Sequence, residues 1–447
     1  MSSPASLPPG SWPLARRAAA RLVSPLQRFL AVEAASGLVL MAATAVALAW
    51  ANSPWRDSYA ALWHSPIGGV AGDHAFVRPL HFWVNDGLMT VFFFVVGLEI
   101  RREAYEGELA EPRRAVLPFA AALGGMLVPA AIYAAFNAGH AGARGWGVPM
   151  ATDIAFAVGV LALLGGRVPA SMRVLLLALA VIDDIGAIVV IAVFYSAGID
   201  GVGLGIAGAG VGAVLVLRWI AVRSPLAYVV PGVAVWIGLL VAGVHPTLAG
   251  VVLGLLTPAR SWFGPAGFAE ATQAHLGAMA EGLDRDALMH HLDGIERARR
   301  EAVSPVERLL HVLHPVVAFG IMPLFALANA GVALEGAVFD GAPLRVFLGI
   351  VLGLAVGKPL GIAVASLVAA ATVARLPSGT TRAGVAVVGV VGGIGFTMSI
   401  FIAQLAFPPG PLLDTAKLAI LVASVAAGLT GLALGRTARL ATESPHA

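Results

Sequence analysis

Long apolar stretches separated by short polar loops recur along almost the whole chain. A helix that crosses a bilayer needs about 20 mostly apolar residues, and about twelve segments reach or approach that length. The pattern therefore predicts an all-α membrane protein with about twelve transmembrane helices. The candidate spans are residues 31–50, 80–98, 115–136, 148–165, 172–197, 201–218, 226–243, 246–257, 311–333, 346–372, 383–408 and 412–435.

Composition supports lipid as the solvent for most of the 447 residues. The chain is 59% hydrophobic and 12% charged, which leaves too few polar side chains to cover a globular protein in water. The absence of cysteine excludes disulfides, thiolate metal sites and cysteine nucleophiles. Although the formal net charge is +3, the basic residues form no continuous patch, which argues against nucleic acid as a partner.

The distribution of basic residues predicts the orientation of the chain. With a cytoplasmic N-terminus, four of the 28 Lys and Arg fall in external loops and two lie within spans, which leaves 22 on the cytoplasmic side. This asymmetry fits the positive-inside rule with both termini in the cytoplasm. Residues 1–28 lack the apolar region of a signal peptide, so we interpret them as a cytoplasmic tail.

We expect a single membrane domain, residues 29–435, with two longer polar segments between its spans. External residues 52–79 contain turn signals between short apolar runs and predict a small hairpin. Cytoplasmic residues 258–308 are charged and partly helical in pattern, with too few apolar residues for a core of their own, so we interpret them as a connector. We expect residues 436–447 to form a second cytoplasmic tail.

Spans three to five and ten to twelve show a weak internal symmetry. Their offset of seven spans is odd, so equivalent helices cross in opposite directions and form an inverted repeat. In each set the middle helix is interrupted, at GVPMATDIAFAVG around Asp153 and at VVGGIGFTMSIFIA around Thr397. Paired interruptions of this kind indicate an ion site at mid-membrane, built from broken helices.

Asp183 and Asp184 lie within the apolar segment LLLALAVIDDIGAIVVIAVFY. A charged side chain at the centre of a membrane helix costs roughly 2.5 to 3.5 kcal/mol, so two adjacent acids need a reason to be there. A packing role is the alternative, but Asn or Ser would serve it without mutual repulsion. Since neighbouring positions point about 100° apart, one acid can face a cavity while the other meets another helix, and we predict that both bind cation and proton.

Four further residues are candidates for support of that site, one of which is Thr397 at the second interruption. Thr152 and Asp153 offer oxygen ligands of the kind that hard cations prefer, although Asp153 also suits an N-cap for a half-helix that begins at Ile154. Lys358, in LAVGKPLGIA, needs a partner such as Asp183 or the carbonyl ends of the broken helices. Snorkelling to the interface is the alternative, and it is the favoured interpretation for Lys417.

Clustered acids in a low dielectric cannot all be ionised together, so protons and a cation compete for the same oxygens. A candidate pH sensor lies at the cytoplasmic ends, where Glu99 and Glu103 follow the second span and His311 and His314 open the ninth. Histidine titrates near physiological pH, but ordinary interfacial charges with capping roles remain an alternative. His245, in GVHPTLAG, is a further candidate, with a purely structural role as its alternative.

The motifs ATDIAFAVGVLALLG, ALAVIDDIGAIVV, GKPLGI and GIGFTMSIFIA occur in order along the chain. With them, residues from about 25 to 435 resemble the bacterial NhaA-type Na⁺/H⁺ antiporter family. The resemblance implies twelve helices with two crossed broken helices, spans four and eleven, and electrogenic, pH-regulated exchange of Na⁺ or Li⁺ for H⁺ across the inner membrane, without a cofactor.

The resemblance also implies roles for individual residues. Asp183 and Asp184 match the ion site, Asp153 and Lys358 match residues that compensate the opposed half-helix dipoles, and residues 52–79 match a hairpin that stabilises a homodimer.

The chain departs from the family pattern at Leu310, where an acidic residue is expected before the first histidine of the ninth span. Glu307, one turn earlier, is a candidate substitute. The connector 258–308 also looks longer than is usual in the family.

Other classes of membrane protein fit the sequence less well. The YD and GxGD motifs of intramembrane aspartyl proteases do not surround the membrane aspartates, and no HExxH motif is present, so we expect no enzyme. An organic-anion symporter with crossed broken helices, or a channel without proton coupling, remains a rival.

Overall fold

The computed structural model describes residues 33–71, 74–196, 198, 200–222, 224–261, 264–280, 284–333, 340–374, 376–377, 379–438 and 440. The predicted N-terminal tail lies outside this part of the chain, as does most of the predicted C-terminal tail. What is described is mostly helical, with one small sheet.

The α-helices are α2 (Glu33–Ala51), α3 (Arg56–His64), α4 (Leu80–Phe82), α5 (Met89–Glu106), α6 (Pro112–Asn137), α7 (Ile154–Leu163), α8 (Ala170–Phe194), α9 (Gly201–Trp219), α10 (Val229–Val241), α11 (Leu248–Leu256), α12 (Pro265–Ala280), α13 (Arg285–Ala302), α14 (Pro305–Val316), α15 (Met322–Asn329), α16 (Gly341–Leu352), α17 (Lys358–Thr372), α18 (Arg382–Gly392), α19 (Phe396–Ala406) and α20 (Pro411–Thr437). Three π-helical segments, Trp83–Leu88, Val317–Ile321 and Gly353–Gly357, join α4 to α5, α14 to α15 and α16 to α17.

Each of the twelve predicted spans contains a helix, which confirms the all-α membrane fold. By length and composition, eight helical segments of the described chain are suited to cross a membrane, or up to ten if the bent pairs α2–α3 and α18–α19 each count as one. Helices α10 and α11 are shorter than the length required of a membrane-crossing helix in this count. The count of twelve, the inverted repeat and the crossing of the broken helices therefore stay predictions.

Short α11 is held by close packing against α5. A Cβ atom added at Gly97 of α5 would lie 2.8 Å from the carbonyl oxygen of Val251, and one added at Gly254 would lie 2.7 Å from that of Phe94. Small residues at such contacts let two membrane helices approach closely. Tertiary packing thus stabilises a segment that is too short to span a bilayer alone.

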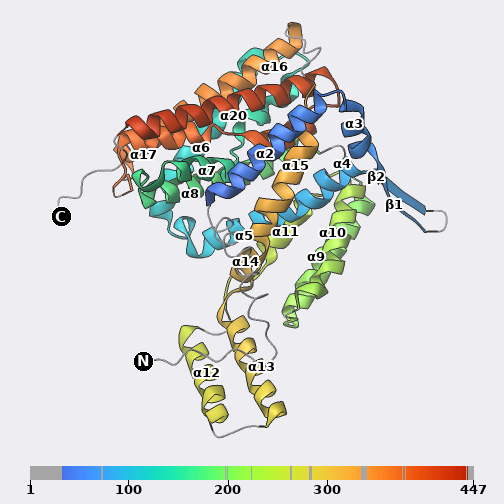
Figure 1. Ribbon diagram of the computed structural model, residues 1–447, viewed down its shortest axis with the longest axis vertical. Coiled ribbons are helices and arrows are strands. Elements are labelled where there is room, and N and C mark those ends of the chain that lie inside the picture. The colour runs from blue at the N-terminus through green and yellow to red at the C-terminus, as the bar shows by residue number, and fades with distance from the viewer. Residues whose placement is uncertain are drawn as a thin grey trace, which may run out of the picture.

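The two polar segments stand apart from the helical bundle (Figure 1). Strands β1 (Pro66–Ala71) and β2 (His74–Pro79) pair in antiparallel register and extend outward beside α3, so the predicted hairpin is confirmed. Helices α12 and α13 pack against each other and project from the bundle, within the segment interpreted as a connector.

The contact between α6 and α17 fixes the helix that carries Lys358. Gly124 of α6 and Gly361 of α17 approach so closely that a Cβ atom on either would overlap the carbonyl oxygen of the other. Gly361 follows Lys358 by about one helical turn. The position of the lysine therefore depends on two glycines.

We predict that Gly361→Ala lowers the free energy of unfolding by about 1–3 kcal/mol, because two backbones in contact must move apart. Gly212→Ala in α9 is the matched control, since a Cβ atom there meets nothing within 4 Å. Thermal unfolding in detergent checks both variants. A Gly361→Ala protein as stable as the control would contradict the role of this contact.

Candidate ion-binding site

The two predicted interruptions meet inside the protein. Helix α7 begins at Ile154 after an extended stretch, and α18 and α19 are separated by a short break that bends the pair by 45°. The backbone N–H of Asp153 in the first break donates to the carbonyl of Ile394 in the second, at 2.7 Å. The second break ends immediately before Phe396, the first residue of α19, and its glycines, such as Gly395, allow the backbones to approach.

Asp153 serves the N-termini of two half-helices at once. Its Oδ1 accepts from the backbone N–H of Phe156 in α7 at 3.0 Å. Its Oδ2 accepts from the backbone N–H of Thr397 in α19 at 3.1 Å and also from the Thr397 hydroxyl. A helix N-terminus carries partial positive charge, so a buried carboxylate here offsets two such ends. The predicted N-cap is confirmed.

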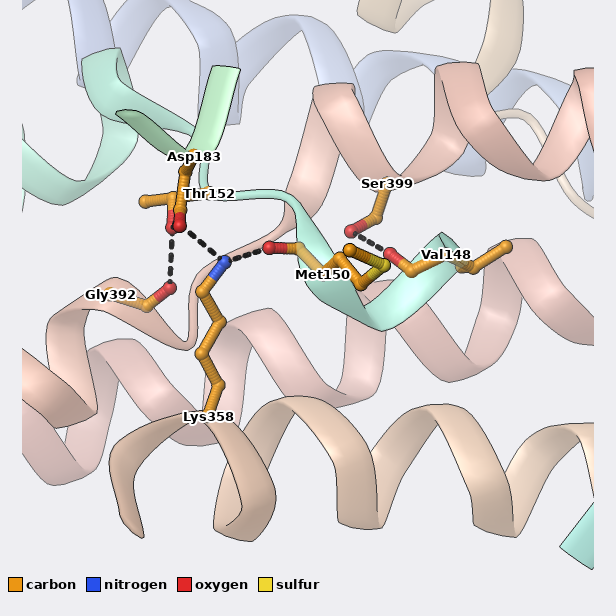
Figure 2. Close-up of polar contacts among 7 residues, drawn as sticks. All are labelled: Val148, Met150, Thr152, Asp183, Lys358, Gly392 and Ser399. Carbon is orange, nitrogen blue, oxygen red and sulfur yellow. Dashed lines mark hydrogen bonds and ion pairs between the residues drawn. The ribbon is translucent and has the colours of Figure 1, made fainter. Parts of the chain in front are cut away.

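Lys358 of α17 contacts both kinds of partner predicted from the sequence, a carboxylate and a backbone carbonyl (Figure 2). Its Nζ lies 2.8 Å from Oδ2 of Asp183 and also donates to the carbonyl of Met150, which precedes the first break. The Thr152 hydroxyl donates to the same Asp183 oxygen at 2.7 Å and lies 3.0 Å from the carbonyl of Gly392. Lys358 is fully buried, which excludes snorkelling.

Asp183 and Asp184 are both buried in α8, and among the described residues each has an oxygen without a partner. Oδ1 of Asp183 and Oδ1 of Asp184 are shielded from solvent and accept no hydrogen bond from the described part of the chain. A buried acceptor in this state is costly, and a bound proton or cation would remove the cost. Carboxylate oxygens are also ligands that a hard cation prefers.

The cluster carries more acids than bases. Asp184 is repelled by Glu99, Asp183 and Asp153 and attracted by Lys358. Since one ammonium faces several carboxylates in a low dielectric, the arrangement favours the uptake of positive charge.

The structure brings together only part of the predicted pH sensor. His314 Nε2 lies 2.7 Å from Glu99 Oε1, and this pair joins α14 to α5. Glu103 instead accepts the backbone N–H of Glu108, and His311 makes no hydrogen bond to the pair within the described residues.

The structure also places Leu310, its candidate substitute Glu307, and His245. Leu310 is buried in the core, and the backbone N–H of Glu307 donates to Ser304 at the start of α14. His245 lies between α10 and α11, where burial lowers the pKa of its imidazole despite a hydrogen bond with the backbone of Tyr195.

Several partners at the site escape detection in the sequence because they are backbone atoms. The carbonyls of Met150 and Gly392 accept hydrogen bonds from Lys358 and Thr152. Ser399 donates to the carbonyl of Val148 at 2.8 Å and ties α19 to the segment before the first break (Figure 2). The only signal for these contacts is the Gly-rich or Pro-containing sequence around each break.

Together, the fold and the cluster define a multi-pass membrane protein with buried, unbalanced carboxylates where two interrupted helices meet. The chain belongs to the family described as Na⁺/H⁺ antiporter 1, whose model matches residues 27–434. It is 59% identical over 436 residues to Na⁺/H⁺ antiporter NhaA 2 of Sorangium cellulosum, covering 96% of this chain and 93% of that protein. Na⁺/H⁺ antiporter NhaA 2 of Myxococcus xanthus is 52% identical with the same coverage, and Na⁺/H⁺ antiporter NhaA of Janthinobacterium sp. is 51% identical, with 97% of each chain covered.

We predict that Lys358→Met lowers the free energy of unfolding by about 3–5 kcal/mol, because it leaves the Asp183 carboxylate buried without its counter-charge. The double variant Asp183→Asn with Lys358→Met should be more stable than Lys358→Met alone. Denaturant unfolding in detergent measures the coupling between the two changes. Strictly additive losses would show that the pair is not coupled.

Proposed function

We propose that the protein exchanges Na⁺ or Li⁺ for H⁺ across the membrane, and that Asp183 and Asp184 bind cation and proton in turn. The observation that carries the proposal is the pair of buried carboxylate oxygens without partners. Membership of a family named for Na⁺/H⁺ antiport supports the choice of ions.

Competition for the same oxygens couples the two ions. A cation that binds Asp183 and Asp184 occupies the oxygens that would otherwise hold protons, so the site cannot carry both at once. The cation also competes with Lys358, whose ammonium lies 2.8 Å from Asp183. Release of either ion therefore favours uptake of the other.

Two carboxyl groups offer two proton positions where a single Na⁺ would contact both. Exchange of more protons than sodium ions would move net charge and make the transport electrogenic. In bacteria, the inward proton gradient would then drive Na⁺ out, which would serve sodium and pH homeostasis. Alternating access would expose the site to one face at a time.

Four residues would support the site. Asp153 and Thr397 hold the N-termini of α7 and α19, while Lys358 and Thr152 bond the carbonyls at the opposite sides of the breaks. These contacts would compensate the half-helix dipoles and keep both interruptions stable inside the membrane.

The proposal also includes the cellular location, the topology and the oligomeric state of the protein. We place the protein in the bacterial inner membrane, as one domain over residues 29–435 with both termini cytoplasmic, in accord with the positive-inside rule. We also propose a homodimer formed through residues 52–79. The exposed side chains of Ile67, Phe76 and Val77 give the projecting β1–β2 hairpin an apolar surface that a second copy would cover.

The proposal predicts that Na⁺ or Li⁺, but not K⁺, dissipates a proton gradient in proteoliposomes, and that Asp184→Asn abolishes the response. Asp57→Asn, which alters an exposed acid of α3, should leave it intact. Faster exchange on collapsing the membrane potential with valinomycin and K⁺ would support electrogenicity. Cation flux without proton movement would indicate a channel, and Na⁺-driven uptake of a labelled organic anion would favour the symporter.

The pH dependence should report the charge beside Asp184. We expect Glu99→Gln to move the pH of half-maximal exchange downward by at least about half a unit, because it removes a negative charge that opposes proton release from the site. His314→Leu, which breaks the pair at 2.7 Å, should also change the profile, whereas His311→Leu should not. Identical profiles in all three variants would remove this pair from pH regulation.

A further inference from the structure

Three side-chain amides form a closed ring of hydrogen bonds away from the ion site. Asn85 lies in the π-helical segment before α5, Asn329 ends α15, and Gln404 lies in the last turns of α19. Asn85 Nδ2 donates to Gln404 Oε1 at 2.8 Å, Gln404 Nε2 donates to Asn329 Oδ1, and Asn329 Nδ2 donates to Asn85 Oδ1 at 2.8 Å. Both asparagines are buried, and His81 Nε2 lies 2.8 Å from the same Asn329 oxygen.

Two of the three helices in the ring are fastened to the hairpin segment. The indole of Trp83, just before α5, donates to the carbonyl of Ile67 in β1 at 2.9 Å. The Tyr59 hydroxyl of α3 donates to the carbonyl of Leu327 in α15 at 2.8 Å. We call α3, β1, β2, the π-helical segment Trp83–Leu88, α5 and α15 the frame. Asn85 and Asn329 therefore belong to the frame, and Gln404 is the contribution of α19.

Helix α19 connects this ring to the ion site. Thr397 in its first turn bonds Asp153, and Gln404 lies seven residues further on, about 10 Å along the helix axis. Between them, the buried ring of Phe401 packs against Phe93 and Phe325 of the frame, with centroids 5.3 and 6.3 Å apart. A path from the carboxylates toward the hairpin along α19 is thus closed by an apolar layer and then by the amide ring.

On the side that faces α14, the surroundings of the carboxylates are different. Glu99 lies close enough to Asp184 for their charges to interact, and its side chain is 17% exposed, while that of its partner His314 is 58% exposed. A titratable group in contact with solvent therefore adjoins the carboxylates on the side of α14. The carboxylates therefore have a partly exposed titratable neighbour toward α14, and buried aromatic and amide groups toward the hairpin.

We propose that the ring of Asn85, Asn329 and Gln404 is a latch that holds the site closed toward the β1–β2 hairpin, and that it must open before ions exchange on that side. This inference rests on the proposed function. Amides suit a latch that opens repeatedly, because each can replace its protein partner by water, whereas a buried amide left dry would have none. His81 adds a further contact to the Asn329 oxygen that Gln404 binds.

Locking the latch gives the first test. The chain has no cysteine, so Asn329→Cys with Gln404→Cys can be joined by a bifunctional thiosulfonate reagent without background reaction. We expect Na⁺-driven proton movement to fall at least tenfold on cross-linking and to recover on reduction with dithiothreitol. Cross-linked protein that exchanges at the rate of the reduced protein would overturn the latch.

The accessibility of a cysteine on α19 to a labelling reagent gives a second test, which requires no measurement of transport. Ala403→Cys places a thiol on α19 at a fully buried position beside Gln404. Addition of Gln404→Met should raise its labelling by a membrane-impermeant maleimide at least tenfold from the side that labels Asp57→Cys, an exposed position of α3 beside the hairpin. The control adds Asn137→Ala instead, which removes a buried amide bonded to the backbone of Tyr133 and Arg345.

Equal labelling in the Gln404→Met and Asn137→Ala backgrounds would overturn the latch, whether or not the protein exchanges Na⁺ for H⁺. Conversely, if labelling of the Ala403→Cys proteins follows the expectation but the wild-type protein moves no protons, the proposed function is rejected and the closed ring remains as a gate for another solute.

Discussion

Backbone groups that leave a helix within a bilayer must find partners in the protein, because lipid supplies no hydrogen bonds. Here two interrupted helices meet this need together. The Asp153 carboxylate accepts from the first turns of α7 and α19, while Thr152 and Lys358 bond the carbonyls of Gly392 and Met150. The charges at the centre of the protein are therefore also what makes the two breaks tolerable.

The same groups join the structural network to the proposed ion site. Asp183 Oδ2 accepts hydrogen bonds from the Lys358 ammonium and the Thr152 hydroxyl, while its other oxygen has no partner in the part of the chain that the structure describes. A proton or cation arriving at Asp183 or Asp184 would thus compete with contacts that reach both breaks. Helix α19, whose first turn bonds Asp153, extends from this site to the amide ring.

The sequence by itself determined the membrane fold and the chemistry at its centre. The length and apolarity of each span are local properties, and every predicted span contains a helix. Asp153, Asp183, Asp184 and Lys358 stood out because a charged group within an apolar segment is costly without a partner or a function. The break before Asp153 and the N-cap that it forms were likewise local signals.

Tertiary structure alone decided which groups meet. It paired Lys358 with Asp183 and with a backbone carbonyl at the same time, and of the sensor candidates it paired His314 with Glu99. It also closed a ring between Asn85 and Asn329, which lie 244 residues apart in the chain. Such contacts leave no spacing in the sequence, since a neutral amide costs less than a charge to bury and its partner is fixed only when helices pack.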